Sequence, residues 1–209
     1  SQALFSSTST EANTAVGYKA MFGNTTGAFN TATGQQALGG NNTGFSNTAD
    51  GSGALFGNTT GEENTATGSD ALVDNTTGNF NTATGSEALL RNSSGNNNTA
   101  DGRNALLHNK SGNDNTADGV DALRHNSTGD RNIAVGRSAG SDLTTGGDNI
   151  DIGNVGAAGE SGHIRIGTIG THTNTFIAGI SGVTVAGGVG VMIDANGQLG
   201  TVTSSERYK

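Results

Sequence analysis

The chain has 209 residues, of which 36 are glycine and none is proline or cysteine, and its formal net charge is −8. The absence of cysteine excludes disulfides and thiolate metal sites, and the glycine spacing excludes a collagen helix. The acidic balance without a basic stripe argues against nucleic acid as a partner. No run of about 18 apolar residues occurs, so no membrane insertion is expected in this segment.

One tripeptide, Asn-Thr-Ala, recurs along the chain at a fixed spacing of 17 residues. Its copies begin at Asn13, Asn30, Asn47, Asn64, Asn81, Asn98 and Asn115. Two degenerate copies, at Asn132 and Asn149, keep the same register. A fixed period of this length is typical of stacked identical units, so the sequence predicts a solenoid.

The aligned unit reads N-T-A-x-G-x-x-A-L-x-x-N-T-T-G-x-x, and its positions are numbered here from the first Asn. The alternation at its start predicts a short strand whose Ala points inward. Position 4 should face water, because it holds Asp50, Asp101 and Asp118. The first Asn of each unit should form a ladder of stacked amides.

The remaining fixed positions predict the core and the corners of each coil. Stacked coils should turn the Ala and Leu positions into a thin continuous core. The glycines at position 5, from Gly17 onwards, and at position 15, from Gly27 onwards, should take positive φ at corners. The stretch around Ala-Leu is expected to be irregular to helical. A core this thin predicts that several chains associate.

The composition changes after position 132, where all nine Ile residues are found. Asn196-Gly197 predicts a hairpin turn between 191–194 and 198–202. We interpret this region as a β-rich neck shared between chains. The short strands expected in it are 163–167, 175–180, 182–185 and 190–194.

The repeat resembles the heads of trimeric autotransporter adhesins of the YadA-like family. The residues that carry the resemblance are Asn-Thr-Ala-Val-Gly-Tyr-Lys-Ala at 13–20, and the match covers residues 1–153. The unit is longer than the family coil, with its extra residues near Asn-Thr-Thr-Gly. The resemblance implies left-handed parallel β-rolls, three side by side. Together with the 17-residue coil and the neck, this predicts an all-β homotrimer: a left-handed parallel β-roll with an intertwined C-terminal neck.

The last residues, 194–209, resemble the junction before the self-cleaving intramolecular chaperone of endosialidases and tail fibres. They read D-A-N-G-Q-L-G-T-V-T-S-S-E-R-Y-K. The resemblance implies that Ser204 is the nucleophile and Lys209 its base, with cleavage after Thr203. The body of such a chaperone is not in the sequence, so we expect no activity from this fragment.

These observations predict three regions: a solenoid head at 1–148, a neck at 149–203 and the start of a processing domain at 204–209. The chain is interpreted as a non-catalytic segment of a longer fibre, either an extracellular adhesin on a bacterial surface or a phage tail fibre. A glycan or a host-surface or matrix receptor is the expected partner besides the homotrimer. A glycan-cleaving fibre and a pure structural spacer are the alternatives.

Two further patterns have simple alternatives to ligand binding. His108 and His125 share position 11 of adjacent coils, which indicates either a metal pair or, in our preferred interpretation, two exposed polar side chains. The segment 146–151 resembles one calcium-binding nonapeptide but is not iterated. No metal ion and no cofactor are therefore expected.

Overall fold

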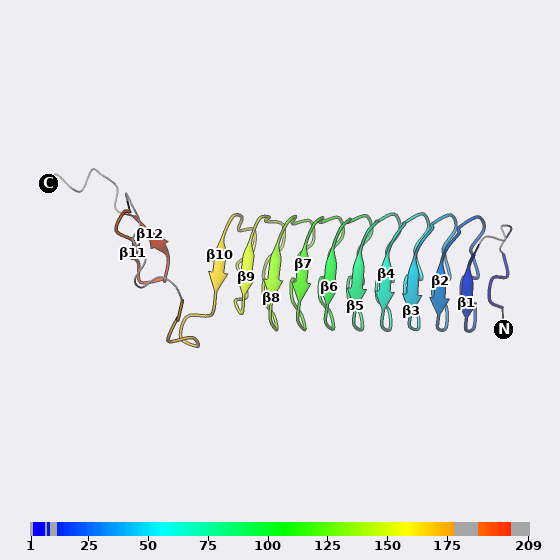
Figure 1. Cartoon of the computed structure of the whole chain (residues 1–209), viewed down its shortest axis with the longest axis horizontal. Helices are drawn as coiled ribbons and strands as arrows, with labels where there is room; N and C mark the ends of the chain where they lie inside the picture. Colours follow the sequence, from blue (N-terminus) through cyan, green and yellow to red (C-terminus); the bar gives the residue numbers. More distant parts are fainter. Residues whose placement is uncertain (1, 7, 9–11, 178–187, 202–209) are drawn as a thin grey trace. The chain divides into compact units, whose positions relative to one another are not determined.

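The computed structural model describes residues 2–6, 8, 12–177 and 188–201. The chain divides into two compact units, Ser1–Ile166 and Gly167–Lys209. The first unit is a stack of coils whose strands form one sheet, which confirms the predicted β-solenoid (Figure 1). The sheet continues past residue 148, where we expected the head to end. The described residues contain no helix.

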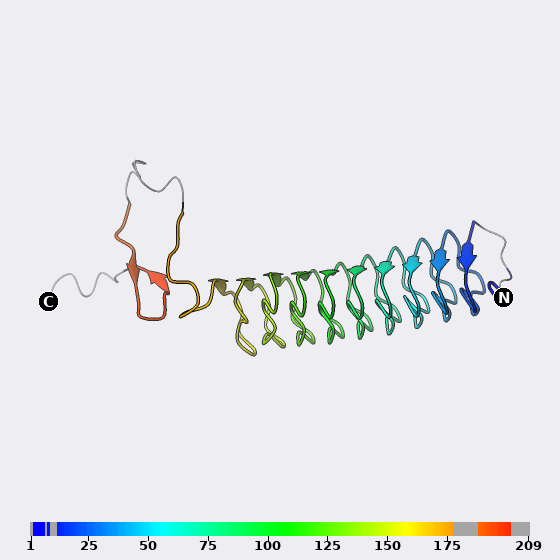
Figure 2. The ribbon, with the colours of Figure 1, turned by 90° about the horizontal axis from the view of Figure 1, so that it is seen from below.

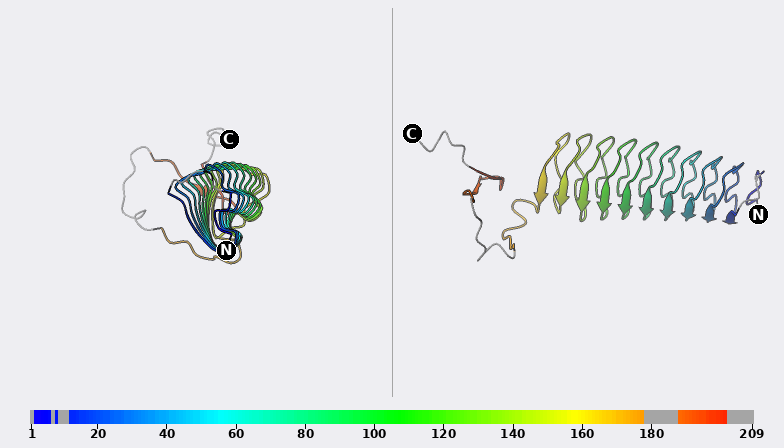
Figure 3. Two further views of the ribbon diagram at one scale, coloured as in Figure 1. Left: turned by 90° about the vertical axis from the view of Figure 1, so that its right-hand side faces the viewer. Right: turned by 45° about the horizontal axis from the view of Figure 1, so that its top comes forward.

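Each coil of the first unit contributes one three-residue strand to a parallel sheet. The strands are β1 (Thr14–Val16), β2 (Thr31–Thr33), β3 (Thr48–Asp50), β4 (Thr65–Thr67), β5 (Thr82–Thr84), β6 (Thr99–Asp101), β7 (Thr116–Asp118), β8 (Ile133–Val135), β9 (Ile150–Ile152) and β10 (Ile164–Ile166). Residues pair with their equivalents one coil away, as Ala49 does with Ala66. Each position of the unit therefore forms a column along the stack (Figures 2 and 3).

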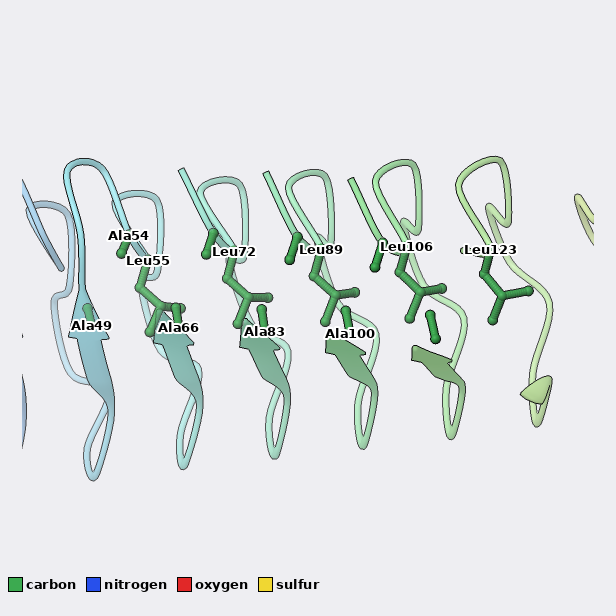
Figure 4. Close-up of a cluster of buried hydrophobic side chains, with 14 of the residues drawn as sticks. Ala49, Ala54, Leu55, Ala66, Leu72, Ala83, Leu89, Ala100, Leu106 and Leu123 are labelled. Carbon is green, nitrogen blue, oxygen red and sulfur yellow. The ribbon is translucent and has the colours of Figure 1, made fainter. Parts of the chain in front are cut away.

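The strands alternate between outward and inward side chains, as predicted. In β3, for example, Thr48 and Asp50 are exposed while Ala49 is fully buried. This inward position holds alanine in every strand from β1 to β8. Alanine, alanine and leucine columns fill the interior (Figure 4), and members such as Ala66, Ala71 and Leu72 have no exposed surface.

The stretch around Ala-Leu is irregular, as one part of the prediction had it, and the helical part of that prediction is wrong, because the chain there turns through left-handed residues. Leu38 and Leu55 have φ of 50° and 52°, and position 7 of the same coils is also left-handed, with Gln36 at 60°. Position 17 provides a third such corner, as at Ser46 with φ of 56°. Left-handed non-glycine residues are normally rare, so the stacked neighbours must hold these corners in place.

The predicted asparagine ladder at position 1 is confirmed. The Asn47 side chain donates from Nδ2 to Asn30 Oδ1 over 3.2 Å, and the Asn47 backbone N–H donates to the same oxygen over 2.9 Å. Asn47 Nδ2 also donates to the Gly61 carbonyl at 2.8 Å. The side-chain amide thus joins its own coil to the next one while remaining fully buried.

A second buried ladder forms at position 12. Asn41 Nδ2 donates to Asn24 Oδ1 at 2.8 Å and to the Gly44 carbonyl at 3.0 Å. The Gly44 carbonyl also accepts from Asn30 Nδ2 of the first ladder, at 2.9 Å. Each position-15 carbonyl therefore links the two ladders across the corner of the coil.

Apart from Gly136 and Gly153, both glycine columns leave no room for a Cβ beside the next coil, but only the position-5 column has positive φ. The position-5 glycines have positive φ as expected, from 111° at Gly136 to 145° at Gly51 apart from Gly153 at 61°. The prediction of positive φ at position 15 is wrong, because Gly78 and its equivalents are absent from the left-handed set. Glycine is required there for space: a Cβ on Gly78 would lie 2.7 Å from Asn92 Nδ2 and closer still to the Gly95 carbonyl oxygen.

We expect Gly78→Ala to destabilise the solenoid by several kcal/mol, on the order of 3 kcal/mol, because backbone and buried amides must move apart. Gly159→Ala is the control, since a Cβ there has open space and meets only the cost of φ of 74°, on the order of 1 kcal/mol. Urea unfolding followed by circular dichroism measures both. Equal losses for the two variants would contradict the crowding at position 15.

Two core positions of the repeat hold different residues near its end. In the coil that begins at Asn132, Gly140 replaces the Leu of position 9 and Leu143 replaces the Asn of position 12. A Cβ on Gly140 would lie 2.8 Å from Leu123 Cδ2 and 3.4 Å from Leu143 Cδ1, so Leu143 fills the space over the glycine. The second ladder stops at Asn126, whose Oδ1 has no hydrogen-bond partner among the described residues.

We expect Gly140→Leu and Leu143→Asn to be destabilising singly and to compensate each other when combined. Gly140→Leu overpacks the column, and Leu143→Asn empties it, each costing about 1 to 3 kcal/mol. The double variant restores the Ala-Leu-x-x-Asn pattern of the earlier coils. A double-mutant cycle in urea measures the coupling, and strictly additive losses would contradict this compensation.

The last coil of the first unit is shorter than the others. The His163 backbone N–H donates to Asn149 Oδ1 over 3.1 Å across a separation of 14 residues, where the preceding steps span 17. The Glu160 carbonyl takes the place of the position-15 glycine and accepts from Asn149 Nδ2 at 2.9 Å. The missing residues are those around the Ala-Leu pair, so the apolar core ends here.

The second unit contains the predicted hairpin. Strands β11 (Met192–Ile193) and β12 (Leu199–Gly200) pair in antiparallel fashion, and Gly197 in the turn has φ of 81°. Residues 175–177 form no strand, and the rest of the strands expected at 175–185 lie outside the described residues. The described side chains of this unit are largely exposed.

Candidate binding surfaces

The predicted processing dyad cannot be placed in the fold. Ser204, Lys209 and the cleavage position after Thr203 lie outside the described residues. The candidate surfaces are therefore those of the solenoid, where side chains that vary between coils stand in columns on a fixed backbone.

The corner at positions 16 and 17 carries an ordered polar column. The Asn79 backbone N–H donates to Asn96 Oδ1, and that of Asn96 donates to Asn113 Oδ1, both over 2.9 Å. The Asn113 backbone N–H continues the series to Asp130 Oδ1 at 2.6 Å. These side chains are held by the main chain of the preceding coil, so their positions are fixed before any ligand arrives.

Position 17 places four different side chains next to this column, in the order Phe80, Asn97, Asp114 and Arg131. The Phe80 ring is 53% exposed. Asn97 Nδ2 donates to Asp114 Oδ1 at 3.1 Å. Together with Asn96, Asn113 and Asp130 these residues line an open hollow of about 570 Å³, which we call the corner groove.

The one guanidinium of the corner groove is already paired. Arg131 Nε and Nη2 donate to the two carboxylate oxygens of Asp148 at 2.7 and 2.8 Å. This hydrogen-bonded pair raises the pKa of Arg131 and lowers the pKa of Asp148. The groove therefore carries two carboxylates, Asp114 and Asp130, against this one guanidinium, and their charges also raise the pKa of Arg131.

His108 and His125 are neighbours, as their shared repeat position predicts. Their rings stack with centroids 5.7 Å apart and planes inclined by 9°. Partial burial lowers the pKa of His108, with contributions from the nearby Arg91 and His125 charges. No group of three or more possible metal ligands occurs among the residues that the structure describes, so this pair stands without a third protein ligand.

The acidic column at position 4 faces outward from the sheet, as expected. Asp101 and Asp118 are directly opposite each other on β6 and β7, and both are exposed. A glycosidase would need two carboxyl groups facing each other across a bound sugar. These two stand side by side on one face of the sheet.

A buried carboxylic acid lies where the alanine column ends. Asp151 occupies the Ala position in β9, is 1% exposed, and neither of its oxygens has a hydrogen-bond partner among the described residues. Loss of hydration, reinforced by the Glu160 charge, raises its pKa to about 6, while Arg165 and His163 act in the opposite direction. Glu160 is itself paired with Arg165, whose Nε donates to Oε1 at 3.0 Å, and this bond lowers the pKa of Glu160.

We expect the last coil to become more stable as the pH falls from about 7 to about 5. The pKa of Asp151 rises from an ordinary 3.8 to about 6 in the folded coil, so the folded state binds the proton more tightly. The resulting penalty is absent below the ordinary pKa and complete above the folded one, amounting to about 3 kcal/mol. Asp151→Ala should remove it, and hydrogen exchange of the β8–β10 amides measures the effect.

Asp142→Ala, an exposed change in the preceding coil, is the control for Asp151→Ala. It should leave the pH dependence of exchange unchanged. The pairing of Glu160 with Arg165 is lost only at a pH below the ordinary pKa of a carboxyl group, outside this window. The same slope in wild type and Asp151→Ala would contradict the assignment to Asp151.

The outward face of the sheet changes from polar to apolar in its last three strands. The strands β2–β7 present Thr and Asp, whereas β8–β10 present only Ile and Val at the two outward positions. The exposed fractions reach 70% for Ile164 and 71% for Ile166. We call this the apolar end of the sheet; it consists of Ile133, Val135, Ile150, Ile152, Ile164 and Ile166.

Two of these features were not predicted, although the sequence contains a signal for each. Positions 16 and 17 were treated as variable, yet Asn79, Asn96 and Asn113 share position 16 in consecutive coils. Asp151 was noted as a degenerate residue, although a carboxylate in a column of buried alanines indicates a break in the core. The 146–151 segment does not converge on a cation, because Asp148 pairs with Arg131 while Asp151 is buried.

No known protein family, curated protein or solved structure matches this chain. Over the residues that the structure describes, no helix has the length and apolar character needed to cross a membrane.

Proposed function

We propose that this chain is a fibrous, non-catalytic segment that displays polar side chains at regular intervals and attaches to surfaces through many weak contacts. The observation that carries the proposal is the parallel sheet of ten in-register strands, which repeats each surface position at every level. Repeated sites on one rod increase avidity without a deep pocket. The candidate settings are an extracellular adhesin on a bacterial surface and a phage tail fibre.

The proposed fibre is a homotrimer of left-handed β-rolls with an intertwined neck, as the YadA-like resemblance implies. The apolar end of the sheet supports association, because a face of five exposed aliphatic side chains and the half-buried Ile150 is favourably covered by another apolar surface. The polar strands β2–β7 offer no such surface. Self-cleavage by Ser204 and Lys209 in a longer parent chain remains a prediction of the second resemblance.

Light scattering after size exclusion tests the assembly. We expect a wild-type mass of about three times the 20.7 kDa chain. Ile152→Asp combined with Ile166→Asp should give monomers, because carboxylates at the apolar end must be desolvated on association. The matched control, Thr67→Asp with Thr84→Asp, changes the same repeat position on β4 and β5 and should leave the mass unchanged. A wild-type monomer at micromolar concentration would overturn the proposal of a trimer.

Binding to a glycan and matrix-protein array, together with a glycan hydrolase assay, tests the function itself. Binding without turnover supports a display segment. Turnover would favour a glycan-cleaving fibre and would direct attention to Asp101 and Asp118. Silence in both assays would leave the structural spacer as the best description.

A further inference from the structure

We propose that the corner groove binds a linear, uncharged oligosaccharide that lies parallel to the axis of the stack, with Phe80 at one end and Arg131 at the other. This inference rests on the proposed function and names a site and a ligand class for it. The groove is formed by positions 16 and 17 of consecutive coils and is an open hollow of about 570 Å³.

The spacing of the groove residues matches the length of a short oligosaccharide. Phe80, Asn97, Asp114 and Arg131 occupy one column, so each is separated from the next by a single coil. Neighbouring strands lie about 4.8 Å apart, which places Phe80 and Arg131 at a separation of about 14 Å. A short chain of linked pyranose rings has a comparable length and presents its hydroxyl groups at a similar interval.

The side chains of the groove are of the kinds that contact sugars. An exposed phenyl ring offers an apolar face of the kind on which a sugar ring packs, and Phe80 is 53% exposed. Amide side chains both donate and accept, as do sugar hydroxyl groups. Asn97 uses one Nδ2 hydrogen on Asp114, and its amide carries a second hydrogen and an oxygen that take no part in that bond.

The charge of the groove favours an uncharged ligand. Arg131 is engaged in a bidentate, solvent-exposed pair with Asp148, so a carboxylate of this chain already balances its charge. Asp114 and Asp130 then dominate the groove, and the whole chain carries a net charge of −8. An anionic glycan would be repelled, whereas carboxylates accept strong hydrogen bonds from neutral hydroxyl groups. The ligand class is therefore uncharged sugars rather than sialylated or uronic ones.

Three polar side chains of the groove are held in place by the backbone. Asn96, Asn113 and Asp130 each accept a backbone N–H of the preceding coil, at 2.9, 2.9 and 2.6 Å. Side chains that are already ordered lose little entropy when a ligand binds. The position-16 side chains of the groove are therefore ordered before a linear chain binds.

Saturation-transfer NMR and calorimetry on the full chain test this site. The probes are the neutral trisaccharides cellotriose, maltotriose and mannotriose, with sialyllactose as the anionic comparison. We expect at least one neutral trisaccharide to bind and sialyllactose to bind at least tenfold more weakly. Phe80→Ala should weaken the neutral complex at least tenfold. The Phe80 ring is half exposed, so circular dichroism of this variant should be that of the wild type.

Phe29→Ala is the matched control, because Phe29 occupies the same repeat position, has nearly the same φ, is 62% exposed and does not line the groove. It should bind like wild type. Binding that survives Phe80→Ala, or a preference for sialyllactose, would overturn the inference. If the chain binds an array glycan or matrix protein but none of the three trisaccharides, the inference fails and the proposed function stands. If nothing on the array is bound either, both fail.

Discussion

The structure depends on one constraint: every interior side chain meets its own copy in the coil above and in the coil below. A residue can fill an interior column only if it is compatible with itself at the spacing of neighbouring strands. Alanine and leucine meet this condition through apolar contact. Asparagine meets it because its amide donates on one side and accepts on the other, as Asn41 does between Asn24 and Asn58. A continuous column of buried carboxylates would not, because neighbouring like charges repel.

The constraint is relaxed at the end of the array, where a residue has no identical neighbour on one side. The second ladder stops at Asn126, and its last oxygen is left without a partner because Leu143 stands where the next asparagine belongs. Asp151 enters the alanine column in β9, and the next strand places Arg165 opposite it. A charge is tolerated here because the column has no identical neighbour on that side. The shorter final coil removes the apolar pair, so the core closes at the point where repetition ends.

The outer columns are free of this constraint, and their composition varies along the stack. Position 4 holds Thr or Asp in β2–β7 and is aliphatic at the apolar end of the sheet. Positions 16 and 17 hold Phe, Asn, Asp and Arg in consecutive coils and form the corner groove. A rigid backbone with variable outer columns separates stability from recognition. Substitutions in the groove should therefore alter binding while the buried columns keep the coils in register.

The sequence by itself determined the solenoid, its 17-residue coil, the alanine and leucine columns, the ladder at position 1 and the hairpin at Asn196-Gly197. These features follow from periodicity, because identical residues at identical intervals must stack. Only the tertiary structure decided what depends on the path of the chain within one coil. The left-handed Leu55 corner, the position-15 glycines crowded by the next coil and the second ladder are all set by contacts between neighbouring coils. A local sequence pattern cannot predict these features, because the atoms that crowd each residue belong to the next coil. The corner groove was not predicted for the same reason, because Phe80 and Arg131 lie in different coils.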